Sequence, residues 1–211
     1  PLTPIQLIID NLKKKYSELF DEKNKISFLE KIKTINKQIK LIEKLVNEFS
    51  DFARMPKPIF KKNELNKIIK DSINLMKTDD KDIAINFDSK EVYYVNSDIE
   101  QLNRVFINLF KNSIESLKEK HEKKGNFQKK IDIEIQQIND YINIEVQDNG
   151  TGFINNDPKV FSKPYFTTKK EGSGLGLSIV EKILNDHNGF IEFISQKEGA
   201  KIKILLPKYV D

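Results

Sequence analysis

Apolar residues recur at helical spacing in two runs at the start of the chain and predict a helical hairpin. The first run extends from Leu2 to about Phe20 and the second over about residues 26–53, with the polar stretch DEKNK between them. Intervals of three and four residues place these side chains on one face of each helix. Pro56 and Pro58 cannot continue the second helix. So narrow a unit cannot cover both stripes, which favours a four-helix bundle with a second copy over packing on the rest of the chain.

Beyond these prolines the pattern changes to short alternating strands mixed with helices. Ser97-Asp98-Ile99-Glu100 has the sequence of a capping box and predicts the start of a helix that runs to near Lys120. Asn139-Asp140 lies between two runs of alternating polarity and predicts a β-hairpin with one buried face. The same periodicities predict helices over residues 63–76 and 175–186, and strands over 83–87, 92–95, 131–138, 141–148, 190–195 and 201–206. The fold is therefore expected to be α+β, with a helical hairpin over 1–57 and a second domain over 58–211.

The charge balance and residue usage exclude several classes of function. The net charge is +4 from 36 basic and 32 acidic residues, and only Arg54 and Arg104 are arginines. Nucleic-acid readers usually carry more guanidinium groups for contacts with bases and phosphates, so no nucleic-acid partner is expected. The absence of cysteine excludes disulfides and thiolate metal sites. No apolar run is long enough to span a bilayer.

Two asparagines one turn apart stand out in the helix that begins near residue 97. The core stripe of this helix is predicted to be Leu102, Val105, Phe106, Leu109 and Ile114. Asn108 and Asn112 share another face, at positions i and i+4. A neutral amide oxygen can ligate Mg²⁺, which takes its other oxygens from water and substrate phosphates. The pair could therefore hold a metal–phosphate unit, although such asparagines more often lie on the surface or cap a turn.

A second candidate is DNGTGF, residues 148–153, immediately after an alternating strand. As a lone feature this sequence predicts a turn. A carboxylate on Asp148 could also accept a hydrogen bond from the exocyclic amine of a purine, with Gly150 and Gly152 leaving room for the ring.

Two further stretches follow. The run GSGLGL, residues 172–177, opens a helix, and its glycines allow backbone amides to approach an anion at the helix N-terminus. It lacks the lysine of a P-loop and follows no first strand, which argues against a Rossmann site. The preceding segment FSKPYFTTKKEG, residues 161–172, suits either a lid with Lys169 or Lys170 near phosphate, or an ordinary surface loop.

In the order NxxxN, DxGxG, aromatic loop and GxGxG, these four stretches resemble the N, G1, F and G2 boxes of the GHKL ATP-binding fold. The closest resemblance is to the catalytic domain of sensor histidine kinases. The opening PLTPIQL, the hairpin and the PYFTTK…GSGLGLSIV block are similar to the NtrY-like, nitrogen-regulation branch. The resemblance covers nearly the whole chain. It implies an α/β sandwich after the hairpin, with a mixed sheet and helices on one face.

The resemblance also implies a role for each motif in binding ATP and Mg²⁺. Asn112 would ligate the metal, Asn108 would support the phosphate end, and Asp148 would anchor adenine. The remaining residues of the expected site are Gly150 and Gly152 in the turn, Phe161, Phe166 and Lys169 in the lid, and Gly172, Gly174, Leu175 and Gly176 in the phosphate loop.

The implied activity is that of a two-component histidine kinase, which transfers the γ-phosphoryl group of ATP to a histidine and then to an aspartate of a response regulator. In this family the acceptor lies in an HExxNP motif whose proline corresponds to Pro1, so the acceptor is expected upstream of this sequence. His121, expected in a charged loop, and His187, at the end of the G2 helix, are not expected to accept phosphate. The chain is then expected to bind ATP without phosphorylating itself.

The resemblance implies a homodimer through the hairpin, a response-regulator receiver domain as partner, and a cytoplasmic location, with any membrane anchor supplied by segments outside this sequence. Two alternatives remain. GHKL-fold ATPases of the gyrase type place a glutamate where this chain has Asn108, which disfavours hydrolysis. A module that binds ATP, dimerises and docks a regulator without kinase activity also fits the sequence.

Overall fold

The computed structural model describes residues 3–76, 82–89, 91–153, 160–161, 163–167, 169 and 172–210. The chain divides into two compact units. The first is Pro1–Met55 with Thr168–Ser173, and the second is Pro56–Thr167 with Gly174–Asp211. No helix within the described ranges combines the length and the apolar character needed to cross a membrane.

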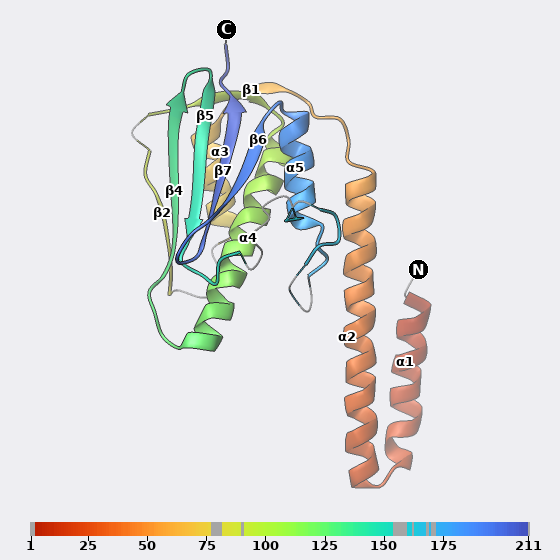
Figure 1. The fold of residues 1–211 in the computed structure, drawn as a ribbon. Helices are drawn as coiled ribbons and strands as arrows, with labels where there is room; N and C mark the ends of the chain where they lie inside the picture. The colour runs from red at the N-terminus through yellow and green to blue at the C-terminus, as the bar shows by residue number, and fades with distance from the viewer. Residues whose placement is uncertain are drawn as a thin grey trace. The chain divides into compact units, whose positions relative to one another are not determined.

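The first unit contains the helical hairpin that the apolar spacing predicted (Figure 1). Its elements are α1 (Thr3–Tyr16), a short 3-10 turn η1 (Ser17–Leu19) and α2 (Glu22–Ala53). Ile9 of α1 packs with Ile32 and Ile39 of α2 in a small buried cluster. Phe28 lies against this cluster, and its ring centroid is 5.0 Å from that of Phe20. The two helices therefore hold together through few side chains.

A mixed five-stranded sheet forms the frame of the second unit. In spatial order its strands are β2 (Ile83–Phe87), β4 (Lys129–Ile138), β5 (Tyr141–Asp148), β7 (Ala200–Pro207) and β6 (Phe190–Ser195). The pair β2–β4 is parallel and the other three pairs are antiparallel. Every second residue of β7 is buried, as expected for a sheet with one covered face.

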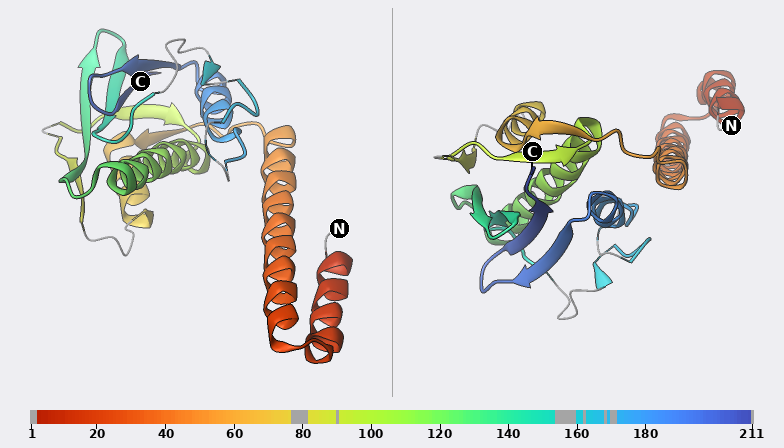
Figure 2. Two further views of the ribbon diagram at one scale, coloured as in Figure 1. Left: turned by 60° about the horizontal axis from the view of Figure 1, so that its bottom comes forward. Right: turned by 90° about the horizontal axis from the view of Figure 1, so that it is seen from above.

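Three helices cover one face of this sheet: α3 (Leu65–Leu75), α4 (Ile99–Lys124) and α5 (Gly176–Asp186) (Figures 1 and 2). The predicted stripe on α4 is fully buried and forms the centre of the core; its members are Leu102, Val105, Phe106, Leu109 and Ile114. The α+β fold with a mixed sheet and helices on one face, predicted from the sequence, is therefore confirmed.

The structure corrects the sequence prediction in two places around the start of the second unit. Lys61–Glu64 forms a strand, β1, where the sequence predicted the start of a helix, and α3 begins only at Leu65. The strand predicted over residues 92–95 lies two residues later, as β3 (Tyr94–Ser97), because it pairs antiparallel with β1. This two-stranded sheet is separate from the five-stranded one, and an isolated bridge joins Val95 of β3 to Lys208, just after β7.

The boundaries of α4 also differ from the prediction. Asp98 is the N-cap instead of Ser97, and its Oδ1 accepts a hydrogen bond of 3.1 Å from Gln101 N. The Ser97 hydroxyl instead accepts one of 3.3 Å from Asn63 Nδ2. The helix runs on to Lys124, so His121 lies on a helix and not in the predicted loop.

Candidate functional site

The site is built around a buried carboxylate at the end of a central strand. Asp148 is the last residue of β5 and is only 5% exposed. Its Oδ1 accepts a hydrogen bond of 2.9 Å from Gly150 N. Burial raises the pKa of Asp148, whereas hydrogen bonds from Gly150 and from Ser113 on α4, together with the charge of Lys120, act to lower it. Such an acceptor, held out of bulk water, suits recognition of a donor on a ligand.

The turn that follows Asp148 is pressed between α4 and the β6–β7 connection. A Cβ atom at Gly150 would lie 2.8 Å from the carbonyl carbon of Ser116 on α4, and 2.9 Å from Asp148 Oδ1. Thr151 N donates a 2.9 Å hydrogen bond to Ser116 Oγ. Gly152 has φ of +76°, and a Cβ atom there would lie 2.6 Å from the carbonyl oxygen of Gly199. Both glycines are therefore required by the close approach of the backbone of α4 and of Gly199 to the turn that follows Asp148.

The two asparagines of the sequence motif lie on α4, and one of them contacts the start of α5. Asn108 Nδ2 donates a 2.8 Å hydrogen bond to Arg104 O. A Cβ atom at Gly176 would lie only 3.2 Å from Asn108 Oδ1. Asn112 is one helical turn further along α4 and is partly buried. The amide side chain of Asn108 and the N-terminus of α5, where the helix dipole favours negative charge, are thus brought together.

Leu175 and Gly174 lead into α5. Leu175 is its fully buried N-cap, and its carbonyl accepts the 2.9 Å hydrogen bond from Ile179 N that opens the helix. Gly174 has φ of +69°, and its carbonyl oxygen accepts a 3.0 Å hydrogen bond from Tyr165 N. A Cβ atom at Gly174 would lie 2.7 Å from the carbonyl oxygen of Phe166. The aromatic loop and the glycine-rich loop therefore meet backbone to backbone.

The two predicted lid phenylalanines belong to one aromatic cluster. Phe161 and Phe166 have ring centroids 6.0 Å apart. Phe161 also packs at 4.5 Å on Phe153, beyond the Asp148 turn, and at 6.0 Å on Phe193 of β6. This cluster ties the aromatic loop to the sheet.

Two other predicted site residues belong to the first unit. Lys169 and Gly172 lie within Thr168–Ser173, and Gly172 N donates a 3.3 Å hydrogen bond to Lys169 O. Lys170, the second lysine considered for a phosphate contact, lies outside the described residues.

Sequence reasoning missed several residues that hold the Asp148 turn. Ser113 and Ser116 follow Asn112 on α4, and the i+4 spacing from Asn112 to Ser116 could have placed Ser116 on the same face of the helix. No local sequence pattern indicates the contacts of Gly199 and Phe193, because both residues reach the turn from a distant part of the chain.

Comparisons with known proteins identify the family and the fold of the chain. Residues 97–210, more than half of the chain, match the model of the histidine kinase-, DNA gyrase B-, and HSP90-like ATPase family. A Rickettsia conorii protein named as an NtrY-like sensor histidine kinase is 36% identical over 209 residues, which are 97% of this chain and 33% of that protein. The nitrogen regulation protein NtrY of Azorhizobium caulinodans is 32% identical over 200 residues, 94% of this chain and 26% of that protein. The chain thus spans a third or less of the length of these relatives.

Solved structures of histidine kinases share the fold. The catalytic domain of histidine kinase ThkA is 28% identical and covers 71% of this chain and 96% of its own, with a TM-score of 0.61. ThkA in complex with the response regulator protein TrrA covers 96% of this chain and 57% of its own, at 24% identity and a TM-score of 0.67. ShkA in complex with AMPPNP covers 88% of this chain and 40% of its own, at 17% identity and a TM-score of 0.70.

The family model spans Asn108, Asp148 and Gly176, the residues around which the candidate site is built. The resemblance to NtrY-like sensor histidine kinases, predicted from the motifs, is confirmed by these comparisons. The chain belongs to the histidine kinase-, DNA gyrase B-, and HSP90-like ATPase family.

Proposed function

We propose that this chain is the dimerising and ATP-binding part of a two-component sensor histidine kinase. The observation that carries the proposal is the buried Asp148 carboxylate beside a turn with no room for side chains at Gly150 and Gly152. The carboxylate accepts a hydrogen bond from the exocyclic amine of adenine, and the purine ring lies against the turn that contains these glycines. Phe161 and Phe166 belong to the lid over the nucleotide.

The phosphates lie toward α4 and the N-terminus of α5. Asn108 supports them there, since its amide already lies against Gly176. Asn112 supplies an amide oxygen to Mg²⁺, and the metal, when bound, neutralises charge on the phosphates. The phosphate loop consists of Gly172, Gly174, Leu175 and Gly176, with Lys169 nearby.

In the intact kinase the γ-phosphoryl group passes in line to a histidine on the dimerisation helix and from there to an aspartate of a receiver domain. These residues contribute by orienting the nucleotide, with little covalent chemistry of their own. Transfer requires the ATP-binding unit to swing against the hairpin, and the stretch from Pro56 to Pro58 is the hinge. The solved complex of ThkA with TrrA supports a response regulator as partner. We place the domain in the cytoplasm, where such a regulator is found.

Neither histidine of the chain suits the role of phosphate acceptor. His187 is 4% exposed; its Nδ1 donates to Ile183 O at 2.8 Å and its Nε2 accepts from Asp98 N at 3.0 Å. Both ring nitrogens are thereby used within the fold. His121 lies on α4, away from the hairpin sequence. We therefore expect no phosphate from ATP on this chain.

The hairpin carries the apolar surface that a dimer requires. Many of its large apolar side chains are at least 40% exposed: Ile5, Leu7, Ile8, Leu12, Leu19, Phe20, Ile26, Ile35, Ile42, Val46 and Phe49. A row of this length is unusual on a monomer and supports pairing of two hairpins in a four-helix bundle.

The proposal is tested by calorimetric titration of the chain with a non-hydrolysable ATP analogue, with and without Mg²⁺. Asp148→Ala should abolish binding, because it removes the adenine acceptor, and Asn112→Ala should abolish the part that depends on Mg²⁺. Lys111→Ala is the matched control, since Lys111 is exposed on α4 next to Asn112. Unchanged affinity in both Asp148→Ala and Asn112→Ala would refute the proposed site.

The same preparations separate the kinase from the alternatives. A gyrase-type ATPase would release phosphate steadily from ATP, whereas the absence of a carboxylate at Asn108 predicts negligible turnover. Extending the chain upstream to include a histidine, and testing phosphotransfer to a receiver domain, distinguishes a kinase from a module that only binds ATP and docks a regulator.

A further inference from the structure

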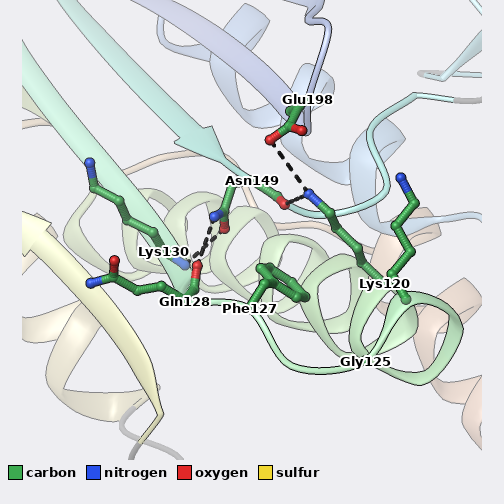
Figure 3. Close-up of a pocket in the computed structure, with 8 residues that line it drawn as sticks. Lys120, Gly125, Phe127, Gln128, Lys130, Asn149 and Glu198 are labelled. Carbon is green, nitrogen blue, oxygen red and sulfur yellow. Dashed lines mark hydrogen bonds and ion pairs between the residues drawn. The ribbon is translucent and has the colours of Figure 1, made fainter.

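A buried lysine donates a hydrogen bond to the turn that follows Asp148. Lys120, near the C-terminal end of α4, is only 9% exposed. Lysine is rarely buried unless its ammonium is paired, so its contacts indicate what it does. Its Nζ donates a 2.6 Å hydrogen bond to Asn149 O and lies 4.8 Å from the ring centroid of Phe127 (Figure 3). Glu198 is its ion-pair partner at 3.9 Å.

Hydrogen bonds fix both the side chain and the carbonyl oxygen of Asn149, the residue between Asp148 and Gly150. Its Oδ1 accepts a 2.9 Å hydrogen bond from Lys130 N, and its Nδ2 donates one of 2.8 Å to Gln128 O (Figure 3). These bonds fix the Asn149 side chain to the start of β4. Its carbonyl oxygen is fixed by the Lys120 ammonium. Lys120 therefore holds the Asn149–Gly150 peptide, whose N–H donates to Asp148 Oδ1.

The ion pair between Lys120 and Glu198 is weak. The Glu198 side chain is 78% exposed, and its oxygen is at the edge of ion-pair distance. Water and salt screen such a contact, so it contributes little. The main contact of the ammonium is therefore the hydrogen bond to the carbonyl of Asn149, and its charge also acts on the buried Asp148.

We propose that Lys120 is a positioning residue for purine recognition: its ammonium fixes the Asp148–Gly150 turn through Asn149 O and places a positive charge beside the carboxylate that accepts the adenine amine. This inference rests on the proposed ATP site and adds to it a residue outside the four sequence motifs. Lys120 does not contact the nucleotide itself.

Electrostatics supports this role. Burial raises the pKa of Asp148, and the charge of Lys120 is among the influences that lower it. Removing that charge leaves burial less opposed, so the Asp148 pKa rises further. A protonated carboxyl group presents one acceptor fewer, and the adenine bond weakens at a higher pH than in the wild type.

The test uses Lys120→Met, which keeps the aliphatic stem against Phe127 but removes the ammonium. Lys124→Met is the matched control, because Lys124 lines the same hollow of about 330 Å³ and is exposed. Dissociation constants for ATP and ADP are measured by calorimetry between about pH 5.5 and 8, together with the thermal unfolding of each variant.

We expect Lys120→Met to weaken ATP and ADP by the same factor, on the order of tenfold, as for loss of a charge-assisted hydrogen bond. Equal factors follow because the change acts at the adenine end and not at the phosphates. The acid limb of the affinity profile should move to higher pH. Lys120→Arg, which keeps the charge, should retain the wild-type acid limb, and Lys124→Met should match the wild type throughout.

The outcomes separate this inference from the proposed function. If the wild type binds no nucleotide, the proposed ATP site fails. If the wild type binds and Lys120→Met keeps its affinity and acid limb, Lys120 has no positioning role while the ATP site stands. Weaker binding with an unmoved acid limb would show a purely structural role and also overturn the inference. Should Lys120→Met not fold, Lys120→Gln, which keeps a donor but no charge, is judged by the same acid limb.

Discussion

Gly150 packs closely against α4, and replacing it by alanine gives a prediction whose size can be worked out. The new Cβ atom would lie 2.8 Å from the Ser116 carbonyl carbon, where ordinary van der Waals contact begins at 3.4 Å. The turn must therefore retreat from α4 by 3.4 − 2.8, or 0.6 Å. The nearest atom is the Ser116 hydroxyl oxygen, which can rotate away, but the carbonyl carbon belongs to the helix backbone and cannot.

A retreat of this size breaks a specific hydrogen bond. The bond from Thr151 N to Ser116 Oγ is 2.9 Å long and would stretch to about 3.5 Å, beyond useful range. Overpacking costs about 1–3 kcal/mol and the lost bond about 1 kcal/mol, so the free energy of unfolding should fall by about 2–4 kcal/mol. Because Asp148 moves with the turn, ATP affinity should fall at least about tenfold.

Urea denaturation and calorimetric ATP titration of Gly150→Ala measure both effects. Gly125→Ala is the control: its Cβ would have no atom within 4 Å, but its φ is +81°. With ψ of −160°, Gly125 lies in a region of backbone conformation that is essentially restricted to glycine. That variant should lose about 1–3 kcal/mol through backbone strain alone and keep its ATP affinity. Adding Ser116→Ala to Gly150→Ala removes the hydroxyl but not the backbone clash, so it should not restore binding. Wild-type stability and affinity in Gly150→Ala would refute this reasoning.

Two further predictions concern stability. Burial lowers the pKa of His187, against its bond to Ile183 O and the charges of Asp98 and Asp186, so the folded protein favours the neutral ring. As the pH falls, the unfolded chain binds a proton at this histidine before the folded protein does, so the free energy of unfolding should fall below about pH 6.5. Urea titrations across pH should show a flatter dependence of this free energy for His187→Gln. An identical dependence in the variant and the wild type would contradict the role of His187. Phe193→Ala opens the aromatic cluster at a side chain only 6% exposed and should cost about 3–5 kcal/mol, whereas the control Phe190→Ala, 58% exposed on the same strand, should cost less than about 1 kcal/mol. Thermal melts giving equal losses for the two phenylalanines would exclude a structural role for the cluster.

Local periodicity was sufficient for most of the secondary structure. The spacing of Leu102, Val105, Phe106 and Leu109 predicts α4 and its buried face, because a helix with one covered side requires that spacing. The alternation around Asn139 predicts the β4–β5 hairpin for the same kind of reason. In both elements, the side chains that become buried can be identified from the local sequence alone.

The elements that were missed depend on distant partners. The residues of β1, KKNE, show no alternation, and they form a strand only because β3 offers backbone partners. Either Ser97 or Asp98 could cap α4; Asp98 also accepts a 2.9 Å hydrogen bond from Ile59 N, while Asn63 engages Ser97. Neither neighbour can be read from the capping sequence.

The candidate site also contains residues that the local sequence predicts and residues that it does not. Its residues with distinctive chemistry, such as Asp148 and the glycines, were predicted by their motifs and stay predictions as nucleotide contacts. The residues that hold them, Ser116 and Lys120 among them, are ordinary helix residues in sequence. Only the folded arrangement shows that both face the Asp148 turn.

The most direct test of the central claim is a crystal structure of the chain with a non-hydrolysable ATP analogue and Mg²⁺. We predict adenine against the turn of Gly150 and Gly152, with its exocyclic amine within hydrogen-bond distance of the Asp148 carboxylate, and the metal at Asn112. Nucleotide bound elsewhere, or none bound at saturating concentration, would contradict the account.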